Sequence, residues 1–164
     1  MHTSKSRFVR RSEMVRLEYT AVTQADPALA WKVFSDWRRW SRFSDFYGNI
    51  RWLSGEPWMV GSRLQIELVR PVRTTVDHVI TVCSPRDCVA WIDHFKGYTM
   101  EQWVVFEALG EGGTRVRTWA ELVGPTSAEG VPVRDTVKNF IELWYSRFCT
   151  ECDGVHEAEC ATLG

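Results

Sequence analysis

Alternating apolar and polar positions dominate the start of the chain and its long middle region. Residues 14–24, MVRLEYTAVTQ, alternate as a half-buried strand does. After Gly48 the same period of two recurs in short segments separated by turn residues. The short connections, among them the glycine-rich segment 110–113, predict an antiparallel meander. Its strands are expected at 49–53, 62–69, 74–82, 88–95, 98–109 and 114–124.

Two other regions break this period and predict helices. Asp26 precedes Pro27, which is an N-cap followed by proline at the first helical position, so a short helix begins there. A second short helix or helical turn is expected at 35–45. In the last part, helical spacing separates the apolar residues Val133, Val137, Phe140, Ile141, Trp144 and Phe148. We therefore expect one long C-terminal helix over about residues 129–153.

This order of elements predicts an α+β fold. An antiparallel sheet of six to seven strands with one apolar face needs a cover, and only the C-terminal helix is long enough to provide it. We expect a curved sheet around that helix, two short helices after the first strand, and a cavity between sheet and helix. The domain should span residues 14–155, with flexible segments at 1–13 and 156–164.

Several local motifs, in the same order as these elements, carry a likeness to a known family. After the first helix, Asp36 is followed by a tryptophan and a serine. Further on come a strand and the glycine that opens the next strand, a Ser-Pro turn leading to a tryptophan strand, and a Gly-Gly-Thr hairpin. In this sequence they are Asp36, Trp40-Ser41, IRWLSG (50–55), VGSRL (60–64), Ser84-Pro85, Val89 with Trp91, and GGTRV (112–116).

With these motifs the chain resembles the START-like helix-grip (SRPBCC) superfamily, particularly its polyketide cyclase/dehydrase and lipid-transport branch, over roughly residues 14–155. The resemblance implies a cavity for a hydrophobic ligand. It implies no particular reaction, because the superfamily includes cyclases, aromatases, hydrolases and plain carriers. No catalytic residue is carried over from it.

Charge and composition narrow the partners. The formal net charge of −1 creates no global field for a polyanion, so no nucleic-acid partner is expected. No apolar run approaches the roughly 20 residues needed to span a bilayer, so no stable membrane insertion is expected. The polar, basic start lacks an apolar signal segment, and the five cysteines then fit reduced thiols in the cytoplasm. A homo-oligomer is compatible with the sequence.

The segment 34–52 concentrates aromatic residues and arginines, and three interpretations stay open. Trp37, Trp40, Phe43 and Phe46 could lie where the short helices meet the open end of a cavity. The same residues could instead pack a helix pair on the core, with the arginines in solvent. The third interpretation, contact with nucleic acid, has little support from the net charge.

The two central hairpins allow a register to be built. The turn at 84–87 would place Cys83 opposite Cys88, and the Lys96-Gly97 turn would place Phe95 opposite Tyr98. Counting from these turns, His78 faces Asp93, Ile80 faces Trp91, and Trp91 faces Gln102. Side chains at alternate positions share a face. The expected cavity face therefore holds His78, Ile80, Val82, Val89, Trp91, Asp93, Met100, Gln102, Val104 and Phe106.

The polar members of that face are His78, Asp93 and Gln102. Asp93 could orient His78 and raise its basicity, which would make the pair a general base for an aldol cyclisation or a dehydration. The alternatives are ligand contact, a buried pair that satisfies itself, and a register slip that places both residues in solvent. The residues expected to bind the ligand are Trp37, Trp40, Trp52, Trp91, Met100, Gln102, Val104, Phe140 and Trp144.

The C-terminal region holds potential metal ligands at Cys149, Cys152, His156 and Cys160. On a continuous helix Cys149 and Cys160 would be about 16 Å apart, which one zinc ion cannot bridge. A metal site would need a break at Asp153-Gly154. We expect no metal and no cofactor, since nucleotide-binding and metalloenzyme signatures are also missing from the sequence.

Three functions remain from the sequence. The first is a carrier or sensor that binds a small hydrophobic molecule, aromatic or polyketide-like, in the cavity. The second is an enzyme of the cyclase, aromatase or dehydratase type that uses the same cavity. The third is an interaction domain whose exposed aromatic residues at 37–58 bind a protein.

Overall fold

The computed structural model describes residues 13–95, 97–125, 127–128 and 131–164. Nearly all of the N-terminal segment 1–13, for which the sequence predicts flexibility, lies outside the described residues, as does Lys96 of the expected turn.

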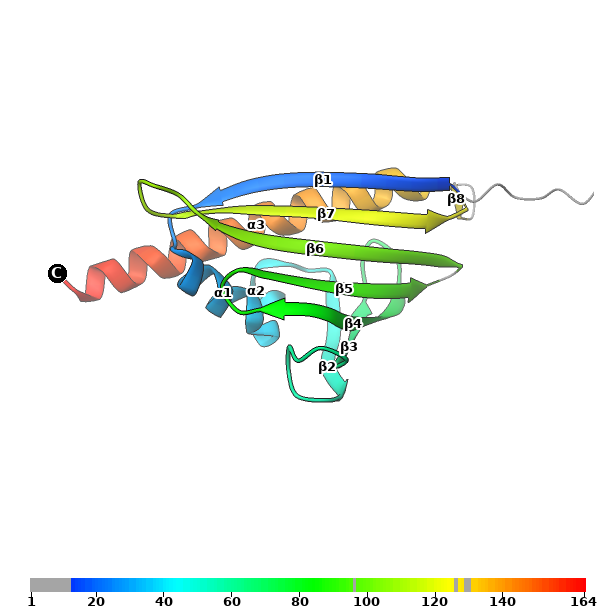
Figure 1. Cartoon of the computed structure of the whole chain (residues 1–164), viewed down its shortest axis with the longest axis horizontal. Helices are drawn as coiled ribbons and strands as arrows, with labels where there is room; N and C mark the ends of the chain where they lie inside the picture. Colours follow the sequence, from blue (N-terminus) through cyan, green and yellow to red (C-terminus); the bar gives the residue numbers. More distant parts are fainter. Residues whose placement is uncertain (1–12, 96, 126, 129–130) are drawn as a thin grey trace, which may run out of the picture.

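One antiparallel sheet forms the frame of the molecule (Figure 1). It has seven strands in the order β1-β7-β6-β5-β4-β3-β2, so the first strand closes one edge beside the last strand of the meander. The strands are β1 (Glu13–Thr23), β2 (Tyr47–Ser54), β3 (Arg63–Leu68), β4 (Thr74–Ser84), β5 (Cys88–Phe95), β6 (Tyr98–Ala108) and β7 (Thr114–Gly124). A separate short pair, β8 (Ser127–Ala128) and β9 (Val131–Pro132), precedes the last helix. The predicted meander and strand number are confirmed.

The helices also follow the predicted order. Helix α1 (Pro27–Ser35) begins after Asp26, whose side chain accepts a hydrogen bond from the Leu29 backbone N–H at 2.8 Å. A 3₁₀ turn, η1 (Trp37–Arg39), and the short α2 (Trp40–Phe43) follow directly. The last helix, α3 (Val133–Thr162), starts later than expected and is continuous through Asp153-Gly154. The segment 156–162, which the sequence assigned to a tail, is therefore helical.

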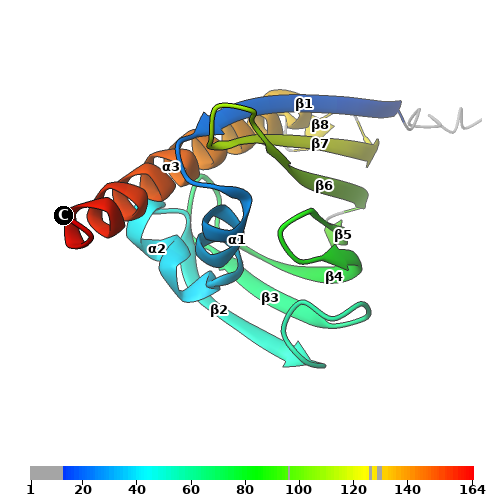
Figure 2. The same cartoon turned by 60° about the vertical axis from the view of Figure 1, so that its left-hand side comes forward.

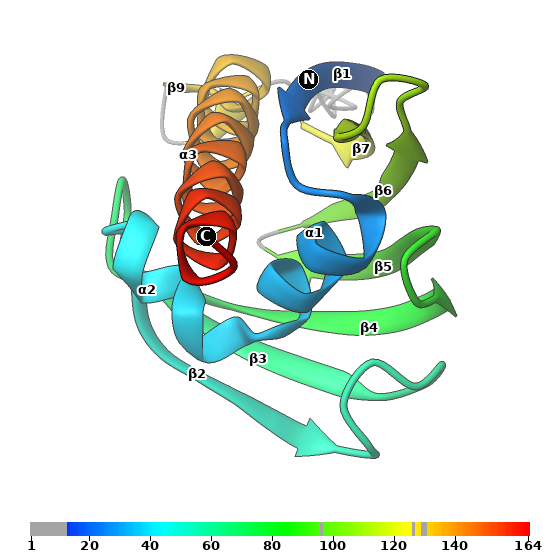
Figure 3. The same cartoon turned by 90° about the vertical axis from the view of Figure 1, so that its left-hand side faces the viewer.

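The sheet curves around α3, as a view along the helix shows (Figure 3). The predicted apolar stripe faces inward, with Ile141, Trp144 and Phe148 buried. At the far end of β1, the Asp153 carboxylate accepts hydrogen bonds from the Thr23 hydroxyl at 2.6 Å and the Gln24 backbone N–H at 2.7 Å. Apolar packing and this polar clamp together fix the helix against the first strand.

A cluster of aromatic rings fills one end of the space between sheet and helix. Phe34, 1% exposed, lies at its centre and contacts the rings of Trp40, Trp144 and Phe148 at centroid distances of 5.8, 5.8 and 5.7 Å. The Trp40 indole N–H donates to the Phe34 carbonyl at 2.9 Å, so its polar atom is satisfied. For Trp40, the structure therefore agrees with the second interpretation of segment 34–52, in which its aromatic residues pack on the core.

The helices α1 and α2 lie beside the C-terminal half of α3, far from the β8-β9 pair (Figures 2 and 3). Because Phe34 and Trp40 belong to these helices, the aromatic cluster occupies only part of the length of the sheet. The remaining part lies under the first turns of α3.

The register agrees with the prediction across β5 and β6 and departs from it in β4. Ile80 pairs with Trp91, as expected. A bulge between Ile80 and Val82 then shifts the pairing by one residue, so that Cys83 lies opposite Val89 rather than Cys88. Because Val82 pairs with Ala90, it leaves the expected cavity face, and Cys83 packs on the core instead. The alternation of apolar and polar residues in the sequence does not reveal where a strand contains a bulge.

The aromatic cluster predicts where the fold is most sensitive. Phe34→Ala should lower the free energy of unfolding by about 3–5 kcal/mol, because the surrounding rings cannot collapse into the space left behind. Lys32→Ala, an exposed substitution on the same helix, should change it by about 0.5 kcal/mol or less. Denaturant titration of both variants measures this difference. Equal midpoints would contradict the central position of Phe34.

Candidate functional site

A cavity of about 260 Å³ lies between the sheet and the first turns of α3. Its volume is close to the lower end of ligand sites, which begin at roughly 300 Å³. Strands β3 and β4 provide apolar walls, and the opposite wall comes from α3. The main apolar residues of these walls are Ile66, Leu68, Val76, Val137, Phe140 and Ile141.

The connection between β3 and β4 forms one side of the cavity and also reaches solvent. Pro71 and Val72 both line the cavity, and Val72 is 54% exposed. Val72 therefore contacts both the cavity and solvent. Beside this connection, the Phe46 carbonyl accepts a hydrogen bond from the Val69 backbone N–H at 2.7 Å, and Phe140 of α3 stacks on Phe46 with ring centroids 4.7 Å apart.

A hydrogen-bonded pair of His78 and Asp93 belongs to the cavity wall. His78 Nδ1 bonds Asp93 Oδ1, which confirms that the two strands bring these residues together. The Asp93 side chain is 0% exposed, whereas that of His78 is 15% exposed and its ring stacks on Trp91 at 4.8 Å. The histidine is therefore the member of the pair nearer to the open space, and the aspartate lies behind it.

Burial controls the charge of this pair. Loss of hydration raises the pKa of Asp93, and the adjacent His78 opposes that shift. The Trp91 indole N–H also lowers this pKa, although it makes no hydrogen bond of good geometry. The second oxygen, Asp93 Oδ2, has no hydrogen-bond partner among the described residues. In the described part of the chain, His78 is the only basic side chain that pairs directly with this buried carboxyl.

Two further polar residues line the cavity with different hydrogen-bond states. Gln102 donates from Nε2 to the Thr118 hydroxyl at 3.0 Å and to the Tyr145 hydroxyl at 3.1 Å, so both amide hydrogens are used within the protein. Burial raises the pKa of Tyr145 well above its usual range, which keeps this hydroxyl neutral. Tyr98 differs, because its buried hydroxyl has no partner among the described residues. Its ring packs directly on Gly124, where a side chain would leave no room for it.

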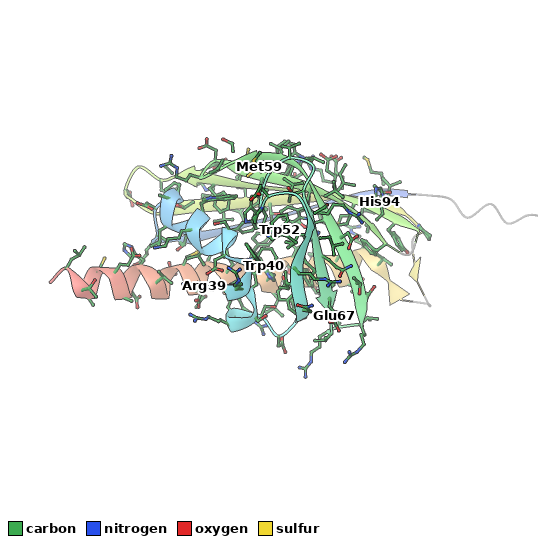
Figure 4. All side chains as sticks on the ribbon, turned by 90° about the horizontal axis from the view of Figure 1, so that it is seen from below. Arg39, Trp40, Trp52, Met59, Glu67 and His94 are labelled. Atoms are coloured by element: carbon green, nitrogen blue, oxygen red, sulfur yellow. The ribbon has the colours of Figure 1, made fainter. Side chains whose placement is uncertain are left out.

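The predicted ligand residues divide into two groups. Met100, Gln102 and Phe140 line the cavity, together with His78 and Asp93. The others lie elsewhere in the described structure. They are Trp40, Trp91, Trp144 and Val104 in the packed core, and Trp37 and Trp52, which are half-buried and meet edge to face at 5.9 Å. Figure 4 labels Trp40 and Trp52 near α2 and β2.

The residues that sequence analysis missed come mainly from β3 and from the start of α3. Ile66 and Leu68 belong to a strand whose alternation was recognised, but no motif placed it beside the cavity. Val137 and Ile141 belong to the recognised helical stripe. Side-chain size gives only a partial signal: the stripe begins with valines and ends with Trp144 and Phe148, but the ring of Phe140 lies in the cavity wall.

The C-terminal cysteines form no metal site in the described part of the chain. No group of three or more potential ligands converges there, and α3 has no break that would bring Cys149 and Cys160 together. Burial raises the pKa of Cys149 to about 12, so its thiol is not a reactive thiolate. Cys160 is exposed, with its sulfur 3.7 Å from His156 Nε2. Among the described helices, none is long and apolar enough to cross a membrane.

Comparison with known proteins identifies the fold. No protein-family model matches the chain, and no curated protein matches it in sequence. Solved structures do match. A putative uncharacterised protein from Rhizobium leguminosarum has a TM-score of 0.72 at 14% identity, covering 88% of this chain and 98% of that one.

Two further solved structures have the same architecture. Ara h 8.0201 has a TM-score of 0.69 at 14% identity, covering 85% of this chain and 98% of that one. Protein CV1439 from Chromobacterium violaceum has a TM-score of 0.62 at 11% identity, covering 84% and 97%. At this level of identity the likeness concerns architecture. With its curved seven-stranded sheet, two short helices and long C-terminal helix, the chain has the START-like helix-grip fold.

Proposed function

We propose that the protein binds one small hydrophobic molecule in the cavity between the sheet and the start of α3, and serves as its carrier or sensor. The observation that carries this proposal is the cavity itself, a space of about 260 Å³ with mostly apolar walls and a few polar groups. Proteins of this fold commonly bind hydrophobic ligands, which supports the same function.

The dimensions of the cavity restrict the size of the ligand. A volume near the lower limit of known ligand sites suits a molecule of one or two rings better than a long polyketide or a two-chain lipid. Phe140 of α3 presents an aromatic ring to the cavity, and this ring also stacks on Phe46 at 4.7 Å. A small aromatic compound therefore fits the proposal best.

The interaction-domain hypothesis loses its main support. It required exposed aromatic residues at 37–58, but Trp40 and Trp58 of that segment are buried, and Trp58 donates its indole N–H to the Ser35 carbonyl at 2.8 Å. The large apolar residue that is exposed within that segment is the aliphatic Leu53, and the exposed Met59 and Val60 follow the segment in the β2–β3 connection, where Figure 4 labels Met59.

The His78–Asp93 pair favours a second candidate, an enzyme of the cyclase, aromatase or dehydratase type. A histidine held by a buried carboxylate can exchange a proton with a bound molecule. For such an enzyme His78 would contact the substrate, and Asp93 would be a positioning residue. The apolar character of the remaining walls makes binding the first proposal and catalysis the second.

Filling the cavity tests the binding proposal. Val137→Trp should abolish binding of the uncharged dye N-phenyl-1-naphthylamine, because the new ring would occupy the space beneath α3. Leu143→Trp is the matched control, since residue 143 lies on the same helix at 39% exposure and outside the cavity wall. The measurement is the saturable increase of dye fluorescence. Equal binding by both variants would place the dye site elsewhere and exclude the cavity as its location.

The buried carboxyl generates a prediction on pH. His78→Ala should cost roughly 3–5 kcal/mol near neutral pH, because it leaves the buried Asp93 carboxyl without its hydrogen-bonded partner. The raised pKa of Asp93 sets the sign: the neutral acid is tolerated in the core, and stability is lost as pH rises through that pKa. The cost relative to the wild type should therefore be larger at about pH 8 than at about pH 4.

Unfolding midpoints across this pH range, for the wild type and for His78→Ala, give the comparison. The double substitution His78→Ala/Asp93→Leu should recover part of the loss near neutral pH, because no buried charge remains. If the cost of His78→Ala were independent of pH, Asp93 would not be the source of the instability.

A further inference from the structure

The cavity wall contains polar groups that can be assigned as hydrogen-bond donors or acceptors, and this assignment restricts the chemistry of the ligand. The group that matters is the His78–Asp93 pair, and both of its residues line the cavity. This inference rests on the binding function proposed above and extends it to the class of ligand.

The first step concerns the net charge of the pair. Asp93 is 0% exposed, and a carboxylate buried in apolar surroundings is costly unless a cation neutralises it. The other groups near the pair contribute less. Asp77, next to His78 in sequence, pairs with Arg63 at 2.6 Å, and the exposed His94, which contacts Thr99, is the smallest of the influences that lower the pKa of Asp93. The pair is electrically neutral when it holds one acidic proton, and burial, which raises the pKa of Asp93, favours that state.

The shared proton can lie on either residue of the pair. If it is on the histidine, both ring nitrogens carry hydrogen and Nδ1–H donates to the Asp93 carboxylate. If it is on Asp93, the carboxylic acid donates to Nδ1, and the neutral ring carries its hydrogen on Nε2. Both arrangements leave an N–H at Nε2. His78 therefore presents a hydrogen-bond donor on the side away from Asp93.

The other polar side chains of the wall do not compete with this donor. Tyr98 lines the cavity, but its hydroxyl oxygen is buried and has no hydrogen-bond partner among the described residues. Gln102 is not a competing donor, since its amide hydrogens are used by Thr118 and Tyr145.

We propose that the ligand of this cavity is a small hydrophobic carbonyl compound, whose oxygen accepts a hydrogen bond from Nε2–H of His78. The apolar walls bind the hydrocarbon part of the molecule, and the histidine orients it. A ketone, ester, lactone or quinone has the required acceptor. A hydrocarbon would bind without orientation, and a phenol would have to use its oxygen as the weaker acceptor.

The test uses two probes of nearly equal shape, 1-indanone and indane, which differ in the carbonyl oxygen. Each competes with N-phenyl-1-naphthylamine for the cavity, and the ratio of the indane to the indanone dissociation constant is measured. This ratio should fall about five- to tenfold from the wild type to His78→Phe/Asp93→Leu, the amount expected for one hydrogen bond. The double variant removes both polar groups, so no buried charge is left behind.

The matched control is His94→Phe. His94 is also a histidine of β5's hairpin region, directly after Asp93 in the sequence, but its side chain is exposed and lies outside the cavity wall. Figure 4 labels it. The ratio should remain at its wild-type value in this variant. An equal fall in both variants, or no fall in the double variant, would overturn the proposal.

An infrared measurement needs no variant and so remains decisive if the double variant does not fold. The carbonyl stretch of 1-indanone bound to the wild-type protein should lie below its value in hexane, because hydrogen bonding weakens the C=O bond. An unshifted stretch would overturn the proposal. A clear preference for 5-indanol, a hydrogen-bond donor, over 1-indanone would also overturn it, because Nε2 would then be an acceptor.

These results separate the two proposals. If the dye, indane and 1-indanone all fail to bind the wild-type protein, the binding function fails and this inference fails with it. If indane binds in the cavity and 1-indanone shows neither the ratio change nor the infrared shift, binding stands and only the assignment of a carbonyl ligand fails.

Discussion

The packing of α3 inside the curved sheet is the constraint on which the rest of the structure depends. A helix held against the concave face of seven strands leaves an interior that side chains must fill or leave open. At one end Phe34, Trp144 and Phe148 fill it with interlocking rings. At the other end the side chains of the sheet and of the first turns of α3 leave about 260 Å³ of space between them. The same helix thus packs on the core with one part of its length and forms one wall of the cavity with another.

The division of the interior also explains why the polar pair lies where it does. A buried carboxyl in the ring-filled half would have no route to solvent or ligand, and its desolvation would be uncompensated. In the open half, Asp93 is backed by the sheet while His78, 15% exposed, reaches the cavity. The hydrogen bond between them makes a polar site compatible with an apolar interior. In the binding function proposed above, the apolar walls bind the hydrocarbon part of the ligand, and His78 orients it.

Periodicity predicted the fold because strands and helices differ in the spacing of their apolar residues, and the hairpin register from Trp91 to Gln102 followed from turn positions. The site was only partly predictable. Counting alternate positions from the hairpin turns correctly placed His78 beside Asp93. In contrast, Trp40 and Trp144 were assigned to the ligand, although their rings pack on each other at 5.5 Å. Sequence does not say which large rings fill a space and which border it. That depends on how far α3 lies from each strand.

The central claim is that an apolar molecule binds under the first turns of α3. Nuclear Overhauser contacts between bound N-phenyl-1-naphthylamine and methyl-labelled protein test it most directly. We predict contacts to the methyl groups of Ile66, Met100 and Ile141, which line the cavity from the sheet and from the helix. Contacts confined to Leu53, Met59 and Val60, which are exposed on or near the β2–β3 connection, would contradict it.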